Sequence, residues 1–172
     1  MSAADRVFSG VVISVDVVQA ALPNGTTARY EIIRHPGGAA VVAVDDQQRV
    51  CLLRQYRPAA DGWVWELPAG RLEPGEAPAY TATRELLEEA GCEASDWQSL
   101  GSVLSSPGVF DEVIHLYLAR GLSYSASRHE QHEVIEVHWL PLAEAVQRAA
   151  DGELRDSKTV IGLMRAAARL AK

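Results

Sequence analysis

Cysteine is scarce in this sequence, where only Cys51 and Cys92 occur among 172 residues. Cys51 lies in an apolar stretch, Cys92 follows a predicted helix, and the two are not spaced as metal ligands. We therefore expect both thiols to be reduced and to have structural roles, as is usual in a cytoplasmic protein.

Basic residues are fewer than acidic residues in this chain. The chain has 16 Lys and Arg residues against 23 Asp and Glu, which gives a formal net charge of −7. General binding to nucleic acid requires a basic face that displaces counterions from the phosphates. We therefore predict no nucleic-acid partner, and an anionic substrate would need local arginines or metal ions.

Long apolar runs, repeats and low-complexity segments are absent from the sequence. No run reaches the length of a membrane span, and residues 1–6 lack the basic and apolar pattern of a signal peptide. Apolar residues make up 48% and charged residues 23% of the chain, as in ordinary globular proteins. We expect one soluble unit of comfortable size, with no membrane partner.

The order of the predicted elements indicates a mixed α/β (α+β) fold. Strands are expected at 11–18, 26–34, 39–44, 50–56, 63–67, 97–105, 113–119 and 134–140. Helices are expected at 77–90, 141–150 and 157–171, and residues 122–131 are expected to be irregular. Because strands and helices do not alternate regularly, a mixed sheet flanked by helices is favoured.

The stretch 70–92 organises the chain as a loop followed by a helix. Pro78 lies where the first helical turn tolerates proline, since its missing N–H would have no intrahelical partner there. Good helix formers follow, and Gly91 stands where a left-handed helix stop is expected.

This helix carries an electrostatic conflict. Glu85, Glu88 and Glu89 are spaced i, i+3 and i+4, so their like charges repel on one side of the helix. They also crowd the C-terminal end, where the helix dipole disfavours carboxylates, and Arg84 offsets only part of this. A solvated acidic face is one interpretation. A bound divalent cation would relieve both problems, and a set of oxygen ligands suits Mg²⁺ or Mn²⁺.

The same stretch, GRLEPGEAPAYTATRELLEEAGC, resembles the signature of the Nudix hydrolase family. The matching positions are Gly70, Glu76, Arg84, Glu85, Leu86, Glu88, Glu89 and Gly91. Cys92 stands in the last aliphatic position of the signature, where a buried cysteine serves as a small apolar residue.

The flanking sequence is similar to the ADP-ribose pyrophosphatase branch of that family. The similar segments are RQYRPAADGWVWELPAGRLEPGE, VIEVHWLPLAEA, KTVIGL and Ser106-Pro107-Gly108, where Pro107 takes the place of the branch's usual proline. The resemblance implies an α/β/α sandwich, with an N-terminal β-hairpin region at 1–38, exchanged in a homodimer, and a hydrolase domain at 39–172. It also implies Mg²⁺-dependent hydrolysis of a nucleotide sugar, ADP-ribose, to AMP and ribose 5-phosphate.

The resemblance implies a set of metal ligands. These are the side chains of Glu85, Glu89 and Glu88 and the backbone carbonyl of Ala69. Glu88 is also a candidate catalytic residue. Arg84 is expected to orient the glutamates, and Glu76 to hold the loop to the helix; a purely structural role is open for both.

Candidate substrate-binding residues surround this motif. Arg54 and Arg57 are expected to bind phosphate, because a guanidinium matches its geometry, although a pair of surface charges is an alternative. Arg71 is a further phosphate candidate, and Glu112 is expected at the terminal ribose. Tyr30, Phe8 and Trp63 are candidates for stacking on the adenine, from the same or the other subunit, and core packing is the alternative for Trp63.

The general base should come from outside the metal cluster. The resemblance implies a glutamate in the loop 127–133, and we favour Glu133 over Glu130. His129 and His132 in the same loop have pKa values suited to proton transfer, although solvated loop histidines are common.

Two different functions remain open. A hydrolase of another nucleotide sugar, such as GDP-mannose, would differ only in the base pocket. A sensor that binds ADP-ribose without cleaving it usually lacks the motif glutamates and is fused to a DNA-binding segment. The glutamates are present in this chain, and no such segment is evident in the sequence.

Overall fold

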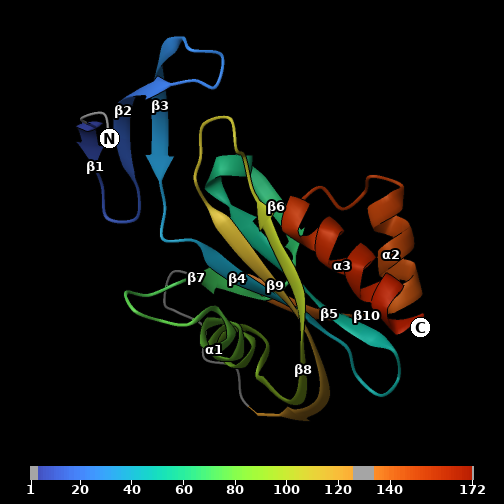
Figure 1. The fold of residues 1–172 in the computed structure, drawn as a ribbon. Coiled ribbons are helices and arrows are strands. Elements are labelled where there is room, and N and C mark those ends of the chain that lie inside the picture. Colours follow the sequence, from blue (N-terminus) through green and yellow to red (C-terminus); the bar gives the residue numbers. More distant parts are fainter. Residues whose placement is uncertain (1–3, 126–133, 172) are drawn as a thin grey trace.

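The computed structural model describes residues 4–125 and 134–171. The N-terminal part is an antiparallel sheet with the strands β1 (Ala4–Ser9), β2 (Ser14–Ala21) and β3 (Thr27–Arg34) in that order. This sheet projects from the rest of the molecule (Figure 1). It is tied to the main body where the N–H of Ile33 donates to the carbonyl of Val109 at 2.8 Å.

The main body contains two further sheets. One has the order β7 (Ala69–Arg71), β4 (Gly38–Ala43), β9 (Val113–Tyr124) and β8 (Cys92–Leu104). Its β4–β9 pair is parallel and its other pairs are antiparallel, so this sheet is mixed. The other has the order β10 (Ile135–Pro141), β5 (Arg49–Arg57) and β6 (Gly62–Glu66), with a 3₁₀ turn at Pro58–Ala60 between β5 and β6.

Helices cover the mixed sheet on both sides (Figure 1). Helix α1 (Pro78–Ala90) packs on one side, and α2 (Leu142–Ala150) and α3 (Ser157–Leu170) pack together on the other. Every residue of β4 is buried, as expected for a strand covered on both faces. The predicted α/β/α sandwich, with its mixed sheet and N-terminal β region, is therefore confirmed.

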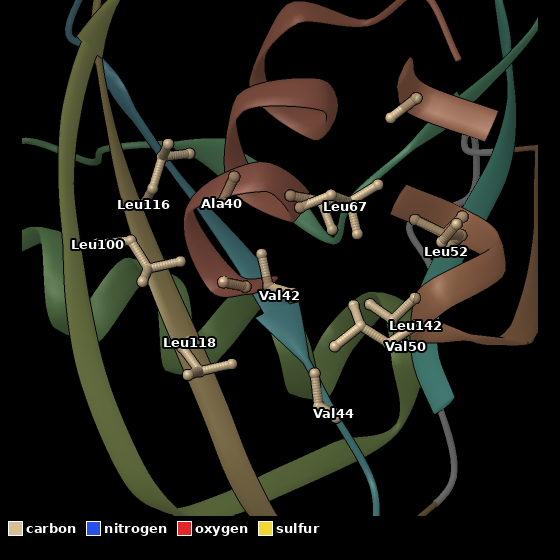
Figure 2. Close-up of a cluster of buried hydrophobic side chains, with 14 of the residues drawn as sticks. Ala40, Val42, Val44, Val50, Leu52, Leu67, Leu100, Leu116, Leu118 and Leu142 are labelled. Carbon is tan, nitrogen blue, oxygen red and sulfur yellow. The ribbon is translucent and has the colours of Figure 1, made fainter. Parts of the chain in front are cut away.

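Alternate residues of β4 point into two separate cores. One core lies against α2 and α3 and contains Ala40, Val42 and Val44, of which Val44 follows the end of the strand. Figure 2 shows this core around Leu67 and Leu116. Ala39, Val41 and Ala43 join the cluster beneath α1. The period of two along a strand thus places both helical layers against one strand. The start of that strand pairs with β7, and α1 packs against both strands.

Helix α1 follows its sequence signals closely. It begins at Pro78 and ends at Ala90. Gly91 follows in the left-handed conformation with φ 63°, and its N–H donates to the carbonyl of Leu87 at 3.0 Å. These local signals also fix which residues of the helix face inward, because Glu85 and Glu89 are buried on the same face as Leu86 and Ala82.

Several predicted strands were wrong in their bounds. Strand β1 was missed, and β2 lies three residues later than predicted at 11–18 because residues 10–13 form the turn from β1. Strand β7 had been predicted as loop, since its Pro and Gly neighbours hide a short edge pairing with β4. Strand β9 continues to Tyr124, although 122–131 had been predicted as irregular, because β8 pairs with it from Cys92 onward.

Within the described residues, no helix is both long and apolar enough to cross a membrane. The division into residues 1–38 and 39–172 remains a prediction.

Both cysteines are free and buried. Burial raises the pKa of the Cys51 thiol, and it raises that of Cys92 to about 11, which agrees with structural roles for both.

Candidate active site

A cavity of about 600 Å³ opens beside the edge of the mixed sheet. Helix α1, β7 and the start of β4 contribute one part of its lining. The end of β5, the beginning of α3 and the segment that contains Ser105 and Glu112 contribute the rest. Elements far apart in the sequence therefore meet here, as is usual for a binding site of this size.

The three glutamates of α1 line this cavity together with Arg84. The guanidinium Nη1 of Arg84 lies 2.7 Å from Glu85 Oε1 and 2.9 Å from Glu88 Oε2. Arg84 thus provides the positive charge that the acidic helix requires. Arg84 therefore offsets part of the predicted repulsion, because it pairs with Glu85 and Glu88.

Glu85 and Glu89 connect α1 to β7. Glu89 Oε2 accepts a hydrogen bond of 2.7 Å from the backbone N–H of Ala69. The carboxylate of Glu85 lies directly over Gly70, where an added Cβ would be 1.8 Å from Glu85 Oε1. A residue without a side chain is therefore required at Gly70 for this helix to approach the strand so closely.

Glu76 anchors the loop before α1 to the helix. Its Oε1 accepts from Arg84 Nε at 3.0 Å, and its Oε2 accepts from the Thr81 hydroxyl at 2.7 Å and from the N–H of Glu73 at 3.0 Å. The side chain is only 7% exposed. The hydrogen bond from Arg84 is the main reason that the pKa of Glu76 is lowered to about 2.

This pKa predicts acid sensitivity of the folded state. Glu76 takes up a proton near pH 4.5 in the unfolded chain but near pH 2 in the folded one, so between these values the unfolded chain binds more protons. Stability should therefore fall as pH falls through this range. In urea unfolding between pH 3 and 6, Glu76→Gln should lose less stability on acidification than the unmodified protein. The exposed Glu93→Gln should behave as the unmodified protein, and an equal loss in Glu76→Gln would contradict the role.

The donor set suits a hard divalent cation. Near Gly70 the cavity offers the carboxylates of Glu85, Glu88 and Glu89, and all are oxygen donors of the kind that Mg²⁺ and Mn²⁺ prefer. Within the described ranges, no three His, Cys, Asp or Glu side chains already converge as metal ligands. Arg84 bridges Glu85 and Glu88, and the N–H of Ala69 donates to Glu89. A cation would have to compete with Arg84 for the same oxygens.

Basic side chains line another part of the cavity. Arg57 and Lys158 approach it from β5 and α3, and Arg71 from β7. The guanidinium of Arg57 makes a bidentate pair with Glu66, at 2.7 Å from Nε to Oε1 and 3.0 Å from Nη2 to Oε2. Carboxylates on α1 and cations on β5 and α3 thus share one cavity, an arrangement that suits a phosphate ligand carried with a metal ion.

Comparison with known proteins identifies the family. A family model described as the NUDIX domain matches residues 34–161, which is most of the chain. The chain belongs to the Nudix family.

Individual Nudix relatives extend this match. The chain is 42% identical over 161 residues to the methanol dehydrogenase activator of Bacillus methanolicus, which covers 92% of this chain and 87% of the relative. It is 38% identical over 163 residues to the ADP-ribose pyrophosphatase of Bacillus subtilis, covering 94% and 88%. A solved structure described as an ADP compounds hydrolase superposes with a TM-score of 0.83 at 24% identity, covering 98% of this chain and 92% of that one. The last match shows the Nudix fold alone.

Most of the predicted site residues meet in the cavity of this Nudix protein. They are Arg57, Ala69, Arg71, Glu85, Glu88, Glu89 and Glu112. Glu112 Oε1 lies 3.2 Å from Nδ1 of His35, and both residues line the cavity. These assignments to metal and substrate remain predictions, because the structure shows where the residues lie and not what they bind.

Two predicted residues lie elsewhere, and two more cannot be placed. Arg54 pairs with Glu136 at 3.3 Å and lies over the ring of Trp63, outside the cavity lining. Tyr30 is 39% exposed on the projecting N-terminal sheet, also outside that lining. Glu130 and Glu133 lie outside the described residues.

The sequence analysis gave no role to several residues at the cavity, among them Lys158, His35 and Ser105. Lys158 lies at the start of α3, and its signal was the KTVIGL segment, which had been noted without a role. His35 follows β3 and precedes Pro36, and it had been given no role. Ser105 lines the cavity with a buried hydroxyl that lacks a hydrogen-bond partner in the part of the chain described, and its sequence context gave no signal.

Proposed function

We propose that this Nudix protein hydrolyses the pyrophosphate bond of ADP-ribose to AMP and ribose 5-phosphate, with Mg²⁺ as the cofactor and Mn²⁺ as a possible substitute. One observation carries the proposal: a single cavity joins the acidic face of α1 to the cations Arg57, Arg71 and Lys158. The Bacillus subtilis ADP-ribose pyrophosphatase, with 38% identity over nearly the whole chain, supports the choice of substrate. Proteins of this family typically depend on divalent metals.

In this proposal, Glu85, Glu88 and Glu89 hold the cation with the carbonyl of Ala69. When bound, the cation neutralises charge on the diphosphate and favours attack by water. Arg57 and Arg71 bind the phosphates, because a guanidinium offers paired donors to phosphate oxygens. The water oxygen bonds to one phosphorus as the bridging P–O bond breaks, which yields two phosphomonoesters. Glu112, which lines the cavity, is proposed to contact the terminal ribose.

The proton of the attacking water requires an acceptor. We propose Glu133, with Glu130 as the alternative, because a carboxylate engaged with a cation is a poor base. Glu88 is the further catalytic candidate, since its side chain is 39% exposed and lies at the cavity. Adenine stacking is proposed for Tyr30 from the second subunit of a homodimer, because Tyr30 lies away from the cavity of its own chain.

The homodimer is supported by the surface of the N-terminal sheet. Val7, Phe8, Val11 and Val12 are 57%, 52%, 97% and 44% exposed, so β1 and the turn that follows it present apolar side chains to solvent. An apolar surface of this kind is typical of an interface between proteins.

A cytoplasmic location remains part of the proposal.

A second function follows from the relative with 42% identity, the methanol dehydrogenase activator. By its name that relative activates methanol dehydrogenase, and under this second function the present protein would activate a dehydrogenase. Hydrolysis of GDP-mannose, and binding of ADP-ribose without cleavage, would each use the same cavity as well.

The experiment is a substrate screen with Mg²⁺. ADP-ribose, NAD, GDP-mannose and other nucleotide sugars are incubated with the protein, and the release of AMP and GMP is measured. The proposal predicts the highest kcat/KM for ADP-ribose, with AMP and ribose 5-phosphate in equal amounts. Consumption of GDP-mannose with ADP-ribose left intact would contradict it, as would faster hydrolysis of NAD. Tight binding of ADP-ribose without cleavage would favour the sensor.

A further inference from the structure

Glu66 is a buried carboxylate that gathers two cations at the cavity. Its side chain is 5% exposed at the end of β6. Besides the bidentate pair with Arg57, its Oε2 accepts from Lys158 Nζ at 2.5 Å. Glu66 and Lys158 lie 92 positions apart in the sequence, so this contact joins β5, β6 and the start of α3 at one point.

Lys158 is held in an unusual place for a lysine. Its side chain is only 13% exposed, and its Nζ also lies 3.1 Å from Asp156 Oδ2. Asp156 is in turn fixed as the N-cap of α3, because its Oδ2 accepts from the N–H of Thr159 at 3.0 Å. Lysine is almost never buried unless it is paired, and here both partners hold it at the lining of the cavity.

Both cations keep donors that these carboxylates do not use. An ammonium has three N–H donors and a guanidinium has five. Lys158 gives two contacts to Glu66 and Asp156, and Arg57 gives two to Glu66. Within the described part of the chain, the side chains of Arg57 and Lys158 make no further hydrogen bond to protein. Both side chains line the cavity. The remaining donors are therefore available to a ligand there.

The cationic pair also lies within electrostatic reach of the acidic helix. The hydrogen bond to Glu66 is the main reason that the pKa of Arg57 is raised, and the charges of Glu89 and Asp156 raise it further. A ligand between the two sides would have phosphate oxygens near cations on β5 and α3 and near the carboxylates of α1. A diphosphate that carries divalent cations matches both sides.

We propose that Lys158 is a substrate-binding residue that binds the diphosphate together with Arg57, and that Glu66 is the positioning residue that holds both cations at the cavity. The proposal rests on the proposed function for the nature of the anion. Beyond that function, Lys158 at the start of α3 becomes a substrate-binding residue, and the buried carboxylate of Glu66 at the end of β6 acquires a role.

The test measures binding of methylenediphosphonate, a diphosphate analogue with a carbon bridge that water cannot cleave. Its affinity is measured by calorimetry without metal for the unmodified protein, Lys158→Gln, Lys158→Arg and Glu66→Gln. Arg49→Gln is the matched control, because Arg49 pairs with the buried Asp45 at 2.8 Å but lies outside the cavity lining. Thermal unfolding of each variant reports on folding separately.

Lys158→Gln should weaken binding about tenfold or more, as expected for loss of a charge-assisted hydrogen bond. Lys158→Arg should restore most of the affinity, and Glu66→Gln should weaken binding even where the melting temperature is unchanged. On the best substrate of the screen, Lys158→Gln should raise KM more than it lowers kcat. Affinity unchanged within about twofold in Lys158→Gln, or an equal loss in Arg49→Gln, would overturn the proposal.

This design separates the two proposals. If the screen finds no ADP-ribose hydrolysis but Lys158→Gln still loses affinity for the diphosphonate, the substrate assignment fails and the role of Lys158 stands. If ADP-ribose is hydrolysed and Lys158→Gln binds and turns over as the unmodified protein does, only the role of Lys158 fails.

Discussion

Glu89→Gln is expected to lower kcat for the hydrolysis of the best substrate by about a hundredfold or more, the scale seen when one group that stabilises developing charge is removed. The substitution removes the charge of a carboxylate that lies buried at the cavity. It keeps an oxygen that can accept from the N–H of Ala69, which Glu89 Oε2 binds at 2.7 Å. We therefore expect a folded protein with its chemistry impaired. The measurement is turnover at saturating Mg²⁺, with circular dichroism to verify folding.

The matched control is Glu144→Gln, on α2. Glu144 is a half-exposed helical glutamate outside the cavity lining, so its substitution should leave kcat within about twofold of the unmodified protein, as for most surface changes. Unchanged turnover in Glu89→Gln would remove Glu89 from the site. A loss of folding in Glu89→Gln would mean that its contact with β7 is chiefly structural.

Gly70→Ala is expected to have the second large effect. An added Cβ would lie 1.8 Å from Glu85 Oε1 and 2.2 Å from Glu85 Cδ, so the carboxylate must move away from β7. Overpacking of this kind costs about 1–3 kcal/mol of stability. A displacement near 1 Å of a group that takes part in catalysis can lower the rate about a hundredfold. The measurements are chemical unfolding and turnover across a Mg²⁺ titration, where a higher Mg²⁺ requirement is expected.

Gly62→Ala serves as the control for this change. Gly62 begins β6, an added Cβ would meet no atom within 4 Å, and its φ is not in the left-handed region. We expect nearly unchanged stability and activity for Gly62→Ala. If Gly70→Ala binds Mg²⁺ and turns over as the unmodified protein does, the close approach of Glu85 to β7 has no part in the site.

The local parts of the site could be predicted from the sequence. Helix α1 has clear start and stop signals at Pro78 and Gly91, and the spacing of its glutamates places Glu85 and Glu89 on one face. Fixed spacing over one loop and helix therefore predicted a metal-binding candidate and a family resemblance. The family match over residues 34–161 agrees with that resemblance.

The parts that depend on distant contacts could not be predicted in this way. Lys158 is held at the cavity by a hydrogen bond to Glu66, which lies 92 positions away in the sequence. No local sequence pattern predicts that pair. Arg54 illustrates a second limit. It is three positions from Arg57 on β5, and side chains an odd number of positions apart on a strand point to opposite faces. Arg57 therefore lines the cavity and Arg54 does not.

The proposed hydrolysis depends on a divalent cation held at the cavity by Glu85, Glu88 and Glu89. Electron paramagnetic resonance of Mn²⁺, titrated into the unmodified protein and into Glu89→Gln with and without methylenediphosphonate, tests this most directly. The account predicts stoichiometric Mn²⁺ binding to the unmodified protein that tightens with the diphosphonate, and binding at least about tenfold weaker in Glu89→Gln, as expected when one charged ligand is lost. Equal Mn²⁺ affinity in the two proteins, or no binding in either, would contradict it.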